Sequence, residues 1–169
     1  MAISNLGGKN RWVEIASSSP TSGTSVSFTS IPQYGRLQLV WFALDTNTSN
    51  AALFYATFNN DTGSNYAYGK LAENSTPVTR LVTTGKDTNI NFGGLFTASQ
   101  GSGKLLIEQA NEIFKTISFS HFTGVINSDQ PSCLIGDGIW NSSSAVDRID
   151  LTINAGTFKS GTIKLYGSN

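Results

Sequence analysis

The sequence predicts an all-β protein folded as an antiparallel, jelly-roll-like β-sandwich, and three observations lead to this class. Apolar and polar residues alternate with a period of two along most of the chain, which is the pattern of strands with one buried face. Segments rich in Gly, Asn, Asp and Ser separate these runs at intervals of roughly 8–12 residues, as in sandwiches and barrels. Both ends of the chain read as strands, which suits the two Greek keys of a jelly roll. Only Leu105–Ala110 hints at a helical turn.

The first strands are expected near residues 25–29 and 36–44. Val26 and Phe28 alternate with serines, and Pro32 ends this run because proline cannot donate to a strand ladder. The next run is apolar on one face from its start and on the opposite face from Val40 onward. We therefore expect its second half, including Phe42, to be buried on both sides.

The remaining strands complete an expected core. Residues 51–58 are apolar on both faces, and alternation returns at 117–120, 148–153 and 163–165. The segment Gly136–Gly138 reads as a turn that folds Trp140 back over an open end of the sandwich. The residues on the apolar sides of these runs are Phe28, Leu37, Leu39, Trp41, Phe119, Ile149, Leu151, Ile163 and Leu165.

Length and composition limit the organisation and the partners of the chain. Its 169 residues predict one sandwich domain, 1–169, whose first part, 1–24, forms an N-terminal strand or arm involved in docking. The formal net charge is zero and no basic run occurs, so we expect no nucleic-acid partner. No segment has the length and apolarity of a membrane span or a signal peptide, so we expect neither a membrane partner nor secretion.

The chain offers few residues for catalysis or metal binding, and we expect no enzyme, no cofactor and no metal site. The single histidine, His121, shares a strand face with Ile117 and Phe119, which predicts a packed or rim residue rather than a catalytic base. Cys133 is the only cysteine and is expected to be a small buried hydrophobe. The segment Asn59–Asn65 lacks the acid density of a calcium loop and predicts an Asx-type turn closing a hairpin.

Self-association is expected because two runs carry more apolar surface than one side of a sandwich can hide. A loop of the same chain is the alternative cover. Trp41 and Trp140 are expected in the core, whereas Trp12 is the tryptophan most suited to dock on another subunit. The candidate interface residues are Val40, Phe42, Phe54, Phe58 and Trp12.

Four segments of the chain resemble a family of tailed-bacteriophage virion proteins. They are SVSFTSIPQYGRLQLV at 25–40, FNNDTGSNY at 58–66, GIWNSSSAVDRIDL at 138–151 and FKSGTIKLYG at 158–167. The resemblance covers residues 25–167, although the chain lacks the long N-terminal shaft or anchoring domain of a tail fibre.

The resemblance implies a jelly-roll structural protein, made in the host cytoplasm and carried on the virion surface. Its partners would be further copies of itself, as a homotrimer, and other virion proteins. A capsid decoration or accessory protein is the first expectation. The alternative is a receptor- or carbohydrate-binding module of a head or tail fibre that contacts host surface glycans, with exposed aromatic residues such as Tyr66 and Tyr68 as stacking platforms.

Overall fold

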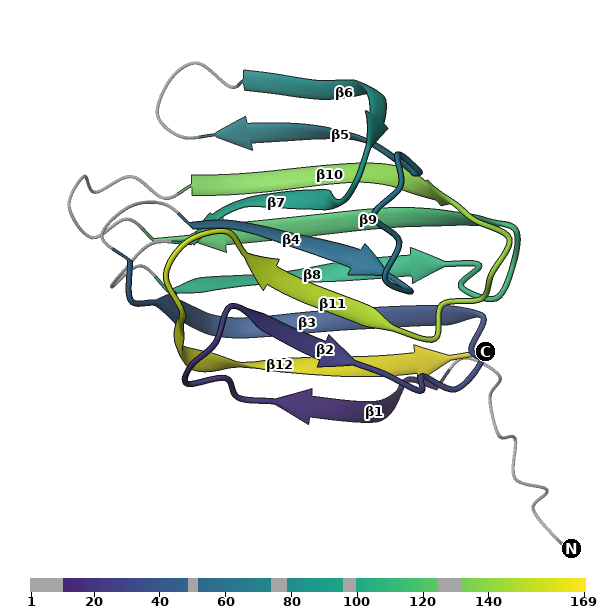
Figure 1. Ribbon diagram of the computed structural model, residues 1–169, viewed down its shortest axis with the longest axis horizontal. Coiled ribbons are helices and arrows are strands. Elements are labelled where there is room, and N and C mark those ends of the chain that lie inside the picture. The colour runs from purple at the N-terminus through teal and green to yellow at the C-terminus, as the bar shows by residue number, and fades with distance from the viewer. Residues whose placement is uncertain (1–10, 49–51, 74–78, 96–99, 125–131) are drawn as a thin grey trace, which may run out of the picture.

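A computed structural model describes residues 11–48, 52–73, 79–95, 100–124 and 132–169. Within these residues the chain forms twelve strands and no helix, arranged as two antiparallel sheets packed face to face. Figure 1 shows the smaller sheet lying across the larger one, with β5 and β6 extending beyond it. The prediction of an all-β antiparallel sandwich is confirmed.

The larger sheet has eight strands and the smaller sheet four. In spatial order, the larger sheet contains β1 (Val13–Ser18), β12 (Phe158–Ser168), β3 (Arg36–Thr46), β8 (Gly101–Glu108), β9 (Phe114–Thr123), β10 (Ser132–Asn141), β5 (Tyr66–Glu73) and β6 (Thr79–Asp87). The smaller sheet contains β2 (Ser25–Phe28), β11 (Ile149–Ile153), β4 (Ala52–Phe58) and β7 (Ile90–Leu95).

The core lies between the two sheets, and the alternation of the sequence predicts it correctly. Trp41 occupies its centre with no exposed surface, and its ring lies 5.3 Å from that of Phe54 and 5.2 Å from that of Phe92. The predicted core residues are all buried: Phe28, Leu37, Leu39, Trp41, Phe119, Ile149, Leu151, Ile163 and Leu165.

The prediction that both faces of the second half of β3 are buried holds for its last three residues, Leu44 to Thr46, and is wrong for Phe42. Phe42 points away from the core and is 51% exposed, whereas Leu44 is fully buried. A β-bulge between Trp41 and Leu44, with Ala43 at a φ of 51°, shifts the alternation by one residue. The backbone N–H of Ala43 donates to the Oγ of Ser102 on β8 at 3.0 Å, which fixes the bulge.

Two further local predictions are wrong. The residues Leu105–Ala110, read as a possible helical turn, belong mostly to strand β8. The segment Gly136–Gly138 lies inside β10 and is not a turn. Both glycines are opposite core residues of β9, and a Cβ on Gly136 would meet the ring of Phe119. A Cβ on Gly138 would meet the carbonyl oxygen of Ala67 and the Cβ of Tyr68 on β5, so close packing against the strand requires glycine at both positions.

The N-terminal part of the chain ends the larger sheet at one edge. Strand β1 pairs with β12, and Lys164 on β12 donates to Glu14 on β1 at 3.0 Å. The expected N-terminal strand is therefore present from Val13 to Ser18. Residues 1–10 of the expected arm lie outside the described residues.

Candidate functional site: an assembly surface on the larger sheet

The five residues predicted to mediate self-association do not share one surface. Phe54 and Phe58 are fully buried between the sheets, so they offer no area to a second copy of the chain and are corrected to core residues. Val40 and Phe42 point outward from β3, on the face of the larger sheet that the smaller sheet does not cover. Trp12 is half-buried, and the guanidinium of Arg36 lies 5.4 Å from the centre of its ring.

A larger apolar feature lies on the same outer face and extends beyond Phe42. Leu71 on β5 stands directly opposite Ile135 on β10, and Cys133 on β10 stands opposite Phe122 on β9. Opposed side chains on neighbouring strands have Cβ atoms about 5 Å apart. We call the contiguous set the apolar row. Its members are Leu71, Phe122, Cys133 and Ile135.

Phe42 extends the apolar row toward β3. Phe122 is opposite Ser102 on β8, and Ser102 in turn bonds to the bulge that follows Phe42. Because the side chain of Ser102 is small, Phe42 on β3 and Phe122 on β9 project further from the sheet than the residue of β8 between them. Three of these residues have closely similar exposure, at 51% for Phe42, 49% for Phe122 and 50% for Ile135. Isolated exposed hydrophobics are common, but a contiguous set across neighbouring strands indicates a contact surface.

Sequence reasoning missed every member of the apolar row, although a signal was present. In β9 the inward residues Phe119 and His121 are followed by an outward phenylalanine, and in β10 Leu134 and Ile135 are consecutive apolar residues. Two adjacent apolar residues in a strand must point to opposite faces. The same alternation places Cys133 outward, so the prediction of a buried cysteine is wrong and its thiol is exposed.

The outer face of the smaller sheet is polar by contrast. Asp150 accepts two hydrogen bonds from the guanidinium of Arg148 at 2.8 Å, and the hydroxyl of Ser27 also donates to it at 2.5 Å. Burial raises the pKa of Asp150, but these hydrogen bonds outweigh it and hold the pKa below its usual value. In the described part of this sheet, Leu53 is the one large hydrophobic residue that is exposed, so no second one lies beside it. The apolar surface therefore belongs to the larger sheet.

The aromatic residues proposed as stacking platforms are buried and structural. Tyr66 has no exposed surface and Tyr68 only 6%. The phenol of Tyr66 accepts from the N–H of Phe58 at 2.9 Å, and burial raises its pKa above the usual value. Trp140 stacks on Tyr66 with an angle of 18° between the rings, so the prediction of a core Trp140 is confirmed. The tyrosines cannot hold a ligand on their faces.

The segment Asn59–Asn65 forms the predicted turn, and Asp61 is its centre. The Asp61 carboxylate accepts from the N–H of Gly63 at 2.8 Å, from the side-chain amide of Asn65 at 2.9 Å and from the indole N–H of Trp140 at 2.7 Å. Partial burial raises the pKa of Asp61, but the three hydrogen bonds more than offset this, so the pKa lies below its ordinary value. The role of the Asp61 carboxylate is therefore structural: it fixes the position of Trp140 by accepting the hydrogen bond from its indole N–H.

We expect Asp61→Ala to lower the free energy of unfolding by about 2 kcal/mol, because it leaves the buried indole N–H of Trp140 without an acceptor and opens the turn. Urea denaturation followed by tryptophan fluorescence measures the change. Asp137→Ala, at an exposed carboxylate on β10, is the control and should change it by less than about 0.5 kcal/mol. Equal losses in both variants would contradict the role given to Asp61.

His121 is packed, as predicted, and both of its ring nitrogens have partners. Its Nδ1 accepts from the indole N–H of Trp41 at 3.0 Å, and its Nε2 lies 3.2 Å from the carbonyl oxygen of Gly94. Only a neutral ring with the proton on Nε2 satisfies both contacts. Burial lowers the pKa of His121 to about 4, and the bond to Gly94 opposes this only in part. The ring is a structural element of the core.

Among the residues that the structure describes, no group of three or more His, Cys, Asp or Glu side chains is placed to hold a metal ion. The described residues also contain no helix long and apolar enough to cross a membrane. Comparison with protein-family models and with curated proteins gives no match.

Proposed function

We propose that this chain is a self-associating structural protein of a tailed-bacteriophage virion, most suited to decorate or reinforce the particle surface. The observation that carries the self-association is the apolar row, with Phe42 beside it, on one face of a sandwich whose other outer face is polar. A second copy placed against this face would remove four large apolar side chains and the small side chain of Cys133 from water, at roughly 25 cal/mol per Å² of apolar surface. The virion role rests on the sequence resemblance.

The strand order supports a jelly roll extended by two hairpins. Strands β1, β12, β3 and β8 are consecutive neighbours in the larger sheet, and β2, β11, β4 and β7 make up the smaller one. Along the chain these eight strands alternate between the sheets at every step except from β4 to β7. This alternation is what two Greek keys generate. The hairpins β5–β6 and β9–β10 widen the larger sheet and carry all four residues of the apolar row, so the added strands are the ones that supply the surface for assembly.

We expect the purified chain to be an oligomer at micromolar concentration and Ile135→Asp to shift it to the monomer. The carboxylate would be placed beside Leu71 and Phe122, where burial without a partner is costly. Light scattering coupled to size exclusion measures the mass. Leu53→Asp is the matched control, since Leu53 is also a strand residue and is 42% exposed on the other sheet, and it should leave the mass unchanged.

Thermal unfolding separates lost assembly from lost folding. Both aspartate variants should unfold cooperatively, because each changes an exposed position. A monomeric wild-type chain, or an oligomer that Ile135→Asp leaves intact, would rule out the apolar row as the interface.

The virion role has its own test. Antibodies raised against the purified chain should label particles from a phage that encodes it, in negatively stained electron micrographs, at many positions on each particle. Label found only in the soluble fraction of the lysate would overturn the virion assignment and leave the self-association untouched.

A further inference from the structure

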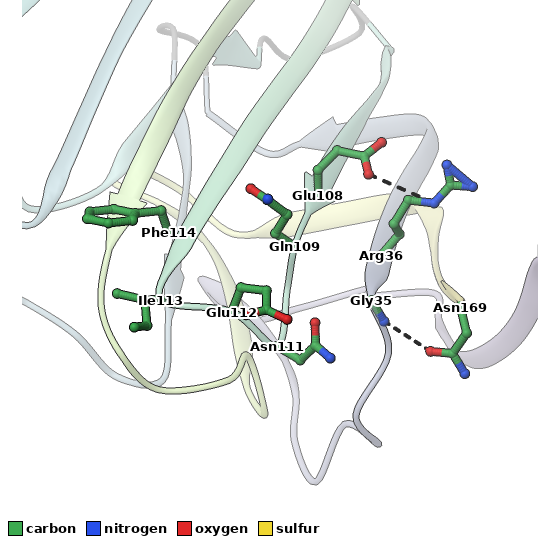
Figure 2. A pocket seen from close by; sticks show the side chains of 9 residues that line it. All are labelled: Gly35, Arg36, Glu108, Gln109, Asn111, Glu112, Ile113, Phe114 and Asn169. Atoms are coloured by element: carbon green, nitrogen blue, oxygen red, sulfur yellow. Dashed lines mark hydrogen bonds and ion pairs between the residues drawn. The ribbon is translucent and has the colours of Figure 1, made fainter.

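We infer that a hollow at the opposite end of the larger sheet from the apolar row binds a neutral pyranose sugar. The hollow has a volume of about 550 Å³ and lies beside the turn that joins β8 to β9. Figure 2 shows its side chains: Phe114 and Ile113 at one end, Arg36 and Asn169 at the other, and polar residues of the turn between them. Its volume is within the range of small-ligand sites, about 300–1,000 Å³.

The turn that forms the hollow is held firmly in place. Ala110 is buried at its base, where its N–H donates to the carbonyl oxygen of Gly35 and its own carbonyl accepts from the N–H of Val146, both at 2.9 Å. Gln109 adopts a φ of 56°, in the left-handed region that non-glycine residues rarely occupy. The N–H of Glu112 closes the turn onto the carbonyl of Gln109 at 2.9 Å. A site on this turn is therefore formed before any ligand arrives.

The turn presents two large apolar side chains to solvent. Phe114 is 60% exposed and Ile113 is 59% exposed, the two highest values among the large hydrophobic residues described. Their neighbour Lys115 is buried, so the strand alternation turns the ring of Phe114 outward. An exposed aromatic ring offers a flat face with negative charge density, which attracts the weakly positive C–H groups of a sugar ring.

Polar groups with unused hydrogen-bonding capacity line the rest of the hollow. The ion pair between Arg36 and Glu108 is loose at 3.9 Å, and both side chains stay about one-third exposed or more. Asn169 uses its oxygen to accept from the N–H of Gly35 at 3.1 Å, which leaves its amide nitrogen to donate. Within the described residues the side chains of Asn111 and Glu112 make no hydrogen bond in the structure. Sugar hydroxyls both donate and accept, so this mixture of carboxylates, amides and a guanidinium matches them.

The charge of the hollow selects among polar ligands. The carboxylate of Glu108 pairs with the guanidinium of Arg36, and the carboxylate of Glu112 interacts with the ammonium of its neighbour Lys115. No excess positive charge is therefore left in the hollow to favour phosphates, sialic acids or other anions. An uncharged pyranose satisfies both the apolar platform and the polar rim without leaving a charge unpaired. This inference stands apart from the proposed assembly role, because neither Phe114 nor Glu112 belongs to the apolar row.

Saturation-transfer NMR with the methyl glycosides of glucose, galactose, mannose and N-acetylglucosamine tests the site. We expect at least one glycoside to receive saturation through its C–H face and Phe114→Ala to weaken its binding at least about tenfold, since the platform is lost. Glu112→Gln should weaken it less, because the amide keeps one acceptor. Leu53→Ala, on the other sheet, is the control and should bind like the wild type.

Further ligands and a mass measurement give the results that would overturn the sugar site. Sialyllactose should bind no better than its neutral lactose core, and tighter binding of the anion would refute the charge argument. Binding of an oligolysine peptide in place of every glycoside would assign the hollow to a basic peptide and overturn the sugar. Glycoside binding that survives Phe114→Ala would place the sugar elsewhere. The oligomer mass of Phe114→Ala should stay that of the wild type, so failure here is distinct from failure of the assembly role.

Discussion

Truncation of Trp41 to alanine should destabilise the protein by about 3–5 kcal/mol, the largest effect we expect of any single substitution described above. The side chain is fully buried and packs edge-on against Phe54. It also makes the only described hydrogen bond to Nδ1 of His121, at 3.0 Å. A Cβ on Gly103 would lie 2.6 Å from the indole, which indicates how closely the opposing strand approaches it. Urea denaturation followed by circular dichroism measures the loss.

Two variants make the Trp41 result specific. Trp41→Phe keeps most of the apolar volume but leaves the buried Nδ1 of His121 without a donor, so it should cost about 1–3 kcal/mol. Phe42→Ala is the matched control from the next position of the same strand. Its side chain is outside the core, so the change should stay within about 0.5 kcal/mol for the monomer. A larger loss for Phe42→Ala than for Trp41→Ala would mean that the faces of β3 are inverted.

The fold was predictable because the period-two pattern and the burial of side chains have one physical origin. Strands with one buried face must alternate, and the core residues from Phe28 to Leu165 were identified on that basis alone. The errors occurred where a local feature interrupts the alternation. The bulge at Ala43 reverses the faces of β3, and no residue type near it signals a bulge in the sequence. Gly136 and Gly138 were read as turn residues because the sequence does not distinguish a glycine required by a turn from a glycine required by close packing.

The candidate surfaces were less predictable, since they depend on which strands become neighbours. The apolar row joins Leu71, Phe122 and Ile135, which come from three strands separated by many residues in the chain. Their pairing follows from the insertion of two hairpins at the same side of the larger sheet, which local patterns do not reveal. The buried position of Phe54 follows in the same way, because apolar residues on two faces of a strand do not indicate which face meets the second sheet.

Acidification should lower the free energy of unfolding in two separate pH ranges, one set by hydrogen-bonded carboxylates and one set by the buried histidine. Burial raises the pKa of Asp61 and Asp150, but their hydrogen bonds more than offset this and hold both pKa values below the ordinary value of 3.8. The stability that these carboxylates contribute is fully present above the unfolded-state pKa of 3.8. It is lost as the pH falls below 3.8 and through their lower folded-state pKa. Any loss of stability at higher pH must come from another group, and the chain has a single histidine.

We expect the free energy of unfolding to fall by about 3 kcal/mol between pH 6.5 and pH 4 because of His121. The unfolded chain binds a proton at its ordinary pKa of 6.5, whereas burial holds the folded-state pKa at about 4, so protons favour the unfolded state throughout this window. Protonation in the folded state would place a second N–H against the indole N–H of Trp41 and a charge in the core. Among the described residues no carboxylate pairs with the ring: its hydrogen bonds are to Trp41 and the backbone of Gly94, and its aromatic contacts are to Trp41 and Phe54.

Nitrogen-detected NMR of the ring gives the most direct measurement, since one histidine produces one set of signals. The spectrum should report the proton on Nε2 near neutral pH and show no titration until the pH approaches 4. In parallel, His121→Gln should be less stable than the wild type at pH 7 and should lose the dependence on pH between 6.5 and 4, while keeping the carboxylate-driven loss below pH 3.8. A histidine that titrates near 6.5 in the folded protein would mean that the ring is solvated. That result would contradict both the burial of His121 and its hydrogen bond from Trp41.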